Sequence, residues 1–187
     1  MRLADLLDRC LVLEERAGAA YRMFAAMADE EAELWAGLAV DEEEHARSIR
    51  KARGSVASDD GALITVDGCE PAFADVERRL GEAEALDPDA SADRRLIAAL
   101  NIELSEIEAL RQLGLRAAGH PHVPDQDHAH LRRLADAARR RSGSDHVRLA
   151  AALLLARERL ATTAGPPGES VIRPLFSCEL APRKRSA

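Results

Sequence analysis

The segment DEEEHARSI, residues 41–49, places four consecutive acids beside a histidine and sets the phase of a helix. Successive helical residues turn by about 100°, so Glu42 and His45 fall within about 60° of one apolar stripe. That stripe consists of Trp35, Leu38, Ala39, Ala46 and Ile49. Glu43 and Glu44 point about 100° and 200° away from Glu42, towards water. We therefore predict that Glu42 and His45 are buried, whereas Glu43 and Glu44 are solvated.

Two other predicted helices carry an acid on an apolar face. The face of Glu14 also carries Leu3, Leu7, Cys10, Leu11, Gly18, Tyr21 and Ala25. The face of Glu103 also carries Leu96, Ala99, Leu100, Ile107 and Leu110. Glu106 flanks Glu103 at the angle that His45 takes beside Glu42. Each of these helices is therefore expected to direct a carboxylate into the interior.

The cost of burying these acids limits what they can be. An unpaired buried charge costs several kcal/mol, and a folded domain is stable by only about 5–15 kcal/mol. The carboxylates must therefore be protonated, ion-paired or bound to a metal. Carboxylate oxygens combined with an imidazole suit iron, manganese or zinc rather than an ion that prefers thiolates.

Composition predicts a single all-α domain with few classes of partner. The 187 residues are rich in Ala, Leu, Glu and Arg, and only 3% are aromatic. The net charge of −7 argues against nucleic acid or an anionic membrane surface as a partner. The longest Ala/Leu run, AAALLLA, is too short to span a membrane.

The cysteines predict a reduced, cytoplasmic protein. Cys10, Cys69 and Cys178 lie far apart, and an odd number cannot form a closed disulfide framework. No CxxC motif occurs, which excludes zinc-ribbon and rubredoxin-type sites. The N-terminal segment carries acids where a signal peptide needs an apolar run.

The order of the predicted elements indicates an antiparallel four-helix bundle over residues 1–143. Its helices are expected at 2–28, 30–53, 90–118 and 126–142, with Asp29 capping the second. The second and third are joined by a crossover, 54–89, long enough to traverse the bundle. This crossover contains an extended piece and a short helix that should pack Phe73, Val76 and Leu80 onto the outside of the bundle.

Beyond the bundle we expect a further helix within 144–164 and a flexible tail at 165–187. The further helix is amphipathic, and it either covers the bundle or forms an interface of a homo-oligomer. An internal repeat supports two related hairpins, because residues 7–28 align without gaps on 96–117. That alignment pairs Glu14 with Glu103 and Tyr21 with Leu110.

Together these motifs resemble the ferritin-like superfamily, and within it the rubrerythrin-type di-iron proteins. The similarity rests on Glu42 and His45 as a Glu-x-x-His motif, on Glu103 and Glu106 as Glu-x-x-Glu, and on Glu14 with Tyr21 seven residues later. It covers roughly residues 2–142.

The resemblance implies a cofactor of one or two iron or manganese ions. The implied ligands are Glu14, Glu42, His45, Glu103 and Glu106. Tyr21 would lie just behind them, and the implied activity is iron handling or oxidoreductase chemistry on O2 or peroxide. The family's rubredoxin-like domain has no counterpart here, so the electron donor would be a separate protein.

The fourth helix departs from the family pattern. Under our alignment its Glu-x-x-His motif falls on Ala138 and Arg141. A competing register, with Asp125 and His128 as the motif, places these residues too close to the preceding turn to reach the level of Glu103. The other histidines of this region, His120, His122 and His130, are likewise expected at the surface.

Two hypotheses about function follow. The first is a metal-binding protein whose site is incomplete at the fourth helix, with Arg141 pairing with Glu103 or Glu106. The second is a metal-free helical bundle that acts as an interaction module through its additional helix or tail. In that hypothesis Arg141 supplies the positive charge of the metal.

Overall fold

The computed structural model describes residues 1–28, 30–56, 66–105, 107–120, 124–141, 144–163 and 179–180. Side chains are described throughout these ranges except at 66–67, 124–129, 141, 157–163 and 179–180. Within them the protein is almost entirely helical, which confirms the all-α prediction. No helix in this part of the chain is long and apolar enough to cross a membrane.

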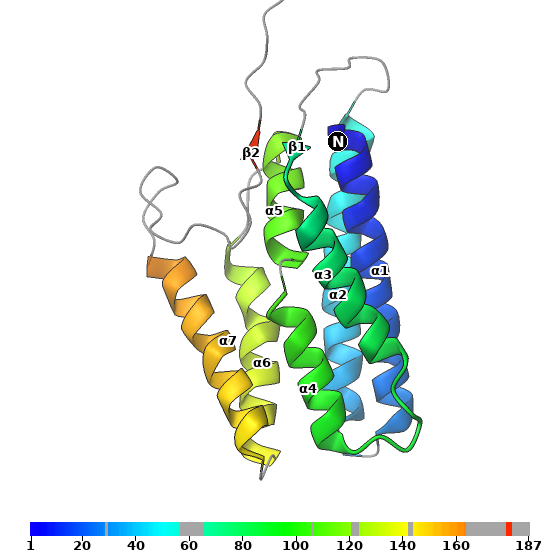
Figure 1. Ribbon diagram of the computed structural model, residues 1–187, viewed down its shortest axis with the longest axis vertical. Coiled ribbons are helices and arrows are strands. Elements are labelled where there is room, and N and C mark those ends of the chain that lie inside the picture. The colour runs from blue at the N-terminus through cyan, green and yellow to red at the C-terminus, as the bar shows by residue number, and fades with distance from the viewer. Residues whose placement is uncertain are drawn as a thin grey trace, which may run out of the picture.

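The first two helices form an antiparallel pair. Helix α1 spans Leu3–Met27, and α2 spans Ala32–Ser55 beside it (Figure 1). Their apolar stripes meet in a core that includes the fully buried rings of Tyr21, Phe24 and Trp35. The predicted cap Asp29 lies outside the described residues, and Glu31 directly precedes α2.

The crossover runs along the outside of these helices, as predicted. It contains β1, Val66–Asp67, and α3, Glu70–Glu84, which contacts α1, α4 and α5. Phe73, Val76 and Leu80 of α3 are fully buried against them. The short strand β1 pairs in antiparallel fashion with β2, Glu179–Leu180, and the rest of the predicted tail lies outside the described residues.

The predicted third helix is wrong in one respect, because it is two helices. Helix α4 spans Ala92–Glu103 and α5 spans Ile107–Ala117. Between them the buried Ser105 donates its hydroxyl to the carbonyl of Ile102 and accepts the backbone N–H of Ile107. These local bonds satisfy backbone groups that a continuous helix would pair elsewhere, so they stabilise the interruption. Glu106 lies outside the described residues.

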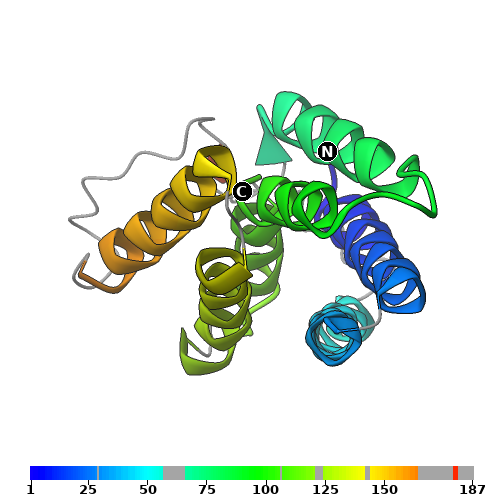
Figure 2. The same ribbon diagram turned by 90° about the horizontal axis from the view of Figure 1, so that it is seen from below.

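The last two helices complete the structure. Helix α6 spans Pro124–Arg141, and it begins at the height of the α4–α5 junction rather than at the far end of α5 (Figure 1). Helix α7, Asp145–Thr163, packs against α6 and α4. Seen end-on, α3 and α7 flank the other helices from outside (Figure 2). The additional helix thus covers its neighbours, although it leaves Leu149 and Leu153 exposed.

The cysteines correct the prediction of a reduced protein. Cys69, which is buried just before α3, is disulfide-bonded. Cys10 is a free thiol buried in α1. The remaining cysteine of the sequence, Cys178, lies outside the described residues. The odd number of cysteines excludes a framework in which every cysteine forms a disulfide, but it does not exclude a single disulfide.

Candidate metal centre

Four of the predicted ligands meet in the interior of the protein. Glu14 comes from α1, Glu42 and His45 from α2, and Glu103 from the last residue of α4. Their exposed fractions are 2%, 4%, 8% and 8%. Glu43 and Glu44 are exposed, so the helical phase predicted from residues 41–49 is confirmed. The fifth predicted ligand, Glu106, lies outside the described residues.

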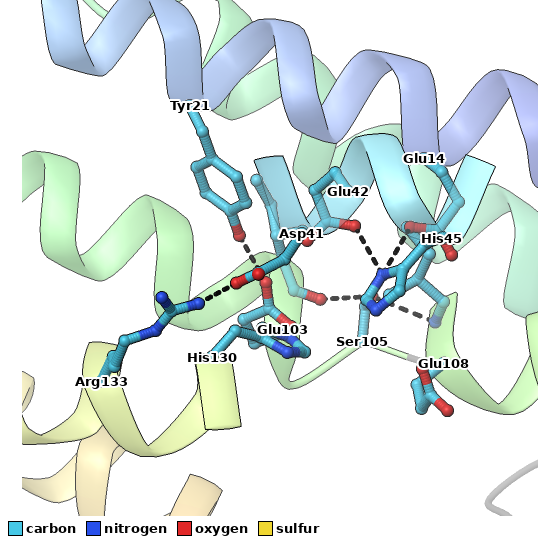
Figure 3. Close-up of polar contacts among 12 residues, drawn as sticks. Glu14, Tyr21, Asp41, Glu42, His45, Glu103, Ser105, Glu108, His130 and Arg133 are labelled. Carbon is cyan, nitrogen blue, oxygen red and sulfur yellow. Dashed lines mark hydrogen bonds and ion pairs between the residues drawn. The ribbon is translucent and has the colours of Figure 1, made fainter. Parts of the chain in front are cut away.

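The fourth helix contributes a histidine that was expected at the surface. His130 of α6 is 3% exposed, and its Nε2 lies 3.1 Å from Oε2 of Glu103 (Figure 3). The surface prediction for this residue is therefore wrong. Ala138, which the predicted register placed at the site, lies eight residues further along α6, about 12 Å away along the axis. The side chains of Asp125 and His128 lie outside those described.

The first cluster of ligand atoms joins α1 to α2. Nδ1 of His45 lies 3.0 Å from Oε2 of Glu42 and 3.5 Å from Oε2 of Glu14. One ligand atom from each of the three residues lies within 4.8 Å of the others. We call Glu14, Glu42 and His45 the first triad.

The second cluster joins α2 to α4 and α6 and shares Glu42 with the first. It consists of Glu42, Glu103 and His130, whose ligand atoms also lie within 4.8 Å of one another. The Tyr21 hydroxyl donates to Oε1 of Glu103 at 2.5 Å, so it holds the outer oxygen of this acid (Figure 3). The rings of His45 and His130 lie edge to face, with centroids 5.4 Å apart. We call Glu42, Glu103 and His130 the second triad.

Among the described side chains, the buried cation beside the site is Arg111. Arg111 of α5 is 3% exposed, and its Nε lies 3.4 Å from Oε1 of Glu14. It also pairs with the half-buried Glu108 one turn earlier. Glu103 contacts His130 and Tyr21, and the side chain of its predicted partner Arg141 lies outside those described. The Arg111 guanidinium therefore lies beside an acid of the first triad.

Burial and neighbouring charges shift the pKa values of the three carboxyl groups in different directions. Burial, reinforced by the charge of Glu14, raises the pKa of Glu42 to about 8. Burial also acts to raise the pKa of Glu14, but His45 and Arg111 outweigh it and lower that pKa to about 2. The pKa of Glu103 is lowered because His130 and Tyr21 outweigh its burial. Without a metal, the site thus holds two ionised acids and one neutral acid near pH 7.

The pKa values of His130 and Tyr21 are shifted by the same neighbouring acid, Glu103. Burial acts to lower the pKa of His130, but Glu103 outweighs it and raises the pKa above its usual value. Burial and the charge of Glu103 raise the pKa of Tyr21 well above the ordinary value, so the phenol stays protonated and donates. Each ionised acid of the metal-free site therefore has a cationic or hydrogen-bonding neighbour.

The donor set fits a transition metal ion in each triad. Bonds of about 2.0–2.2 Å to nitrogen and oxygen place neighbouring ligand atoms about 3.0–3.5 Å apart. The contacts of His45 with its two acids, at 3.0 and 3.5 Å, and of His130 with Glu103, at 3.1 Å, match that spacing. Nδ1 of His130 is buried and has no hydrogen-bond partner among the described residues, which is unusual for a polar atom in a protein interior.

The sequence contains a motif that could have indicated His130 as a ligand. Asp127 precedes His130 by three residues, the same spacing as Glu42 and His45. The side chain of Asp127 is outside those described. Arg111 carried no such signal, because a continuous helix would place it about 80° from Glu103. Its position at Glu14 depends on the break between α4 and α5.

Comparisons of the chain with models of known families, with curated proteins and with solved structures found no match. The residues themselves therefore carry the argument about function.

Proposed function

We propose that this protein binds two transition metal ions, iron or manganese, in a ferritin-like four-helix arrangement. The observation that carries the proposal is the pair of buried triads that share Glu42. Each triad combines two carboxylates with one imidazole, which is a donor set for these metals. Glu42 would be a ligand common to both sites.

The arrangement of the helices supports the ferritin-like part of the proposal. Each of α1, α2, α4 and α6 contributes a residue to the triads. The chain between α2 and α4 descends along the outside as α3, so α2 and α4 run in the same direction (Figure 1). A bundle with one long crossover has this connectivity.

The proposed activity is the oxidation of bound Fe2+ by O2 or peroxide, which takes up the electrons. For repeated turnover, a separate protein would donate electrons that return the iron to Fe2+. Bound metal would supply open coordination positions and exchangeable electrons. The chain would supply the rest. Glu42 would contribute a ligand to both sites, and Tyr21 and Arg111 contact Oε1 of Glu103 and Oε1 of Glu14 and so restrain these two acids.

A second candidate function rests on how the metal-free site balances the charges of its buried acids. Arg111 and His45 both contact Glu14, His130 pairs with Glu103, and Glu42 is neutral near pH 7. This network resembles a buried polar cluster that needs no ion. In that case the protein would be a structural or interaction module, with Arg111 in the role expected of Arg141.

The two candidates differ in iron chemistry. Metal-free protein would be mixed anaerobically with two equivalents of Fe2+ and exposed to air, and the remaining Fe2+ followed with a ferrous chelator. We expect wild type to speed the loss of Fe2+ over buffer, and Glu42→Ala to abolish the effect. Glu43→Ala is the matched control, because Glu43 is its exposed neighbour. Equal rates for buffer, wild type and both variants would favour the second candidate.

A further inference from the structure

A cavity of about 310 Å³ opens between α1 and α2, and both acids of the first triad are among the residues that line it. Glu14 and Glu42 line its inner part, and the exposed Glu43 lines it as well. At about 30 Å³ for each water molecule, a divalent cation with six waters needs roughly 200 Å³, which this volume accommodates. The cavity is thus large enough for a hydrated ion.

Gly18 of α1 keeps this cavity open above Glu42. A Cβ atom at position 18 would lie 3.3 Å from the Cβ of Glu42 and 3.5 Å from Nη1 of Arg22. A longer side chain would extend into the space that the cavity occupies. The absence of a side chain at this position therefore leaves a passage to a buried acid.

The charges of the lining favour a cation. Four carboxyl groups and two guanidinium groups line the cavity, and with Glu42 neutral near pH 7 their formal charges, three negative and two positive, leave −1. One guanidinium, that of Arg50, pairs with Glu15 at 2.5 Å. Glu43 carries a charge at the solvent side, next in sequence to the buried Glu42. A net negative charge at an entrance raises the local concentration of cations and their rate of entry.

We propose that this cavity is the route by which a hydrated divalent cation reaches the buried triads. Glu43 attracts the ion, and Glu42 and Glu14 replace its waters as it moves inwards. The inference rests on the proposed function, since it assumes that the triads bind metal. It adds a direction of entry, through the α1–α2 face, and a role for one exposed acid.

The charge of Glu43 provides the first test, with Co2+ as the ion. Trp35 is the only tryptophan of the chain and stacks on Tyr21, which contacts Glu103, so bound Co2+ should quench its fluorescence. Stopped-flow mixing at low salt should show uptake by Glu43→Lys slowed about three- to tenfold. At about 1 M salt, where the screening length is about 3 Å, the difference should shrink.

Glu44→Lys is the matched control. Glu44 is the next residue and is exposed, but it does not line the cavity. Its replacement should slow uptake less than Glu43→Lys does, and by less than about twofold at about 0.15 M salt, where the screening length is about 8 Å. Equal slowing by Glu43→Lys and Glu44→Lys would overturn the proposed route.

Gly18→Leu provides a steric test, with Gly81→Leu as its control. Gly81 is also helical, and a Cβ there meets nothing within 4 Å. Gly18→Leu should slow uptake more than tenfold, and Gly81→Leu should leave it unchanged. If Gly18→Leu fails to fold, the charge variants still decide.

Elemental analysis at equilibrium separates this inference from the proposed function. Glu43→Lys, Gly18→Leu and wild type should all reach the same final cobalt content, because none of the substitutions removes a triad residue. Full content with unchanged rates in Glu43→Lys would overturn only the route. No bound cobalt in wild type would overturn the proposed function and the route with it.

Discussion

Glu42 is the residue on which both triads depend, and its neighbours decide its charge. Burial and the nearby Glu14 raise its pKa to about 8, so in metal-free protein it is a neutral acid at pH 7. Metal ligands must be deprotonated, so binding of an ion would expel this proton. The same residue therefore links metal binding and stability to pH.

The stability of metal-free protein should fall as Glu42 ionises. Its pKa is about 4.3 in the unfolded chain and about 8 in the folded protein. The folded state thus holds the extra proton between these values, and the stability this residue contributes below about pH 4 is lost as pH rises towards 8. Glu42→Gln stays neutral, so its free energy of unfolding should exceed that of wild type by up to a few kcal/mol near pH 8.

Urea unfolding of chelator-treated protein from about pH 5 to pH 8 measures this difference. Comparison of the two curves cancels the opposite dependence of Glu14, whose lowered pKa contributes stability that is lost only at lower pH. Parallel curves for wild type and Glu42→Gln would show that Glu42 is not a buried, protonated acid in the metal-free state.

The two histidines should control one ion each. His45 belongs only to the first triad and His130 only to the second. We therefore expect His45→Ala and His130→Ala each to retain about one ion of two, since loss of a ligand weakens one position and leaves the other. His146→Ala, an exposed histidine of α7, is the control. Elemental analysis after dialysis gives the counts, and full occupancy in His130→Ala would remove that residue from the site.

At the scale of single residues, helical phase predicted burial but not partners. The sequence separated Glu42 and His45 from Glu43 and Glu44, because a period of 3.6 residues determines which side chains face inwards. It did not identify His130 or Arg111, whose positions depend on where α5 and α6 begin. Periodicity describes one helix at a time, whereas a shared site depends on the offset between helices.

At the scale of elements, the break between α4 and α5 explains both corrections at the site. The residues at the break include no glycine or proline, and the apolar pattern continues across it. Among the described residues, the bonds of the Ser105 hydroxyl with Ile102 and Ile107 mark the interruption. The prediction placed the start of the fourth helix at the far end of a continuous third helix, so it chose Ala138. With α6 starting at the junction, His130 reaches the level of Glu103.

The close approach of α5 to α1 gives a test of this packing. A Cβ at Gly114 would lie 2.9 Å from Cδ2 of the fully buried Leu7, whereas a Cβ at Gly81 of α3 meets nothing within 4 Å. Gly81→Ala should stabilise the protein by about 0.5–1 kcal/mol, the usual gain for alanine over glycine in a helix.

Gly114→Ala should lose that gain and destabilise the protein by about 1 kcal/mol or more, because Leu7 must shift in a packed core. Thermal unfolding of the two variants and wild type measures both effects. Equal stabilisation by the two substitutions would mean that α5 does not approach α1 so closely.

At the scale of the whole molecule, the crossover and the additional helix close the structure around the site. The length of the segment 54–89 predicted the path of α3, because a connection between parallel helices must cross the height of the bundle. The disulfide of Cys69 was not predictable, since pairing depends on distance in the fold rather than on spacing in the sequence. The sequence thus predicted the helices and most of the buried acids but not the offsets that complete the two triads.

The central claim, that both triads bind metal, is tested most directly by counting ions. Metal-free wild type and Glu42→Ala would be dialysed to equilibrium against Mn2+, and the bound manganese per chain determined by elemental analysis. The shared position of Glu42 predicts two ions in wild type and nearly none in Glu42→Ala. Wild type that binds no manganese, or as much as Glu42→Ala, would contradict the metal centre.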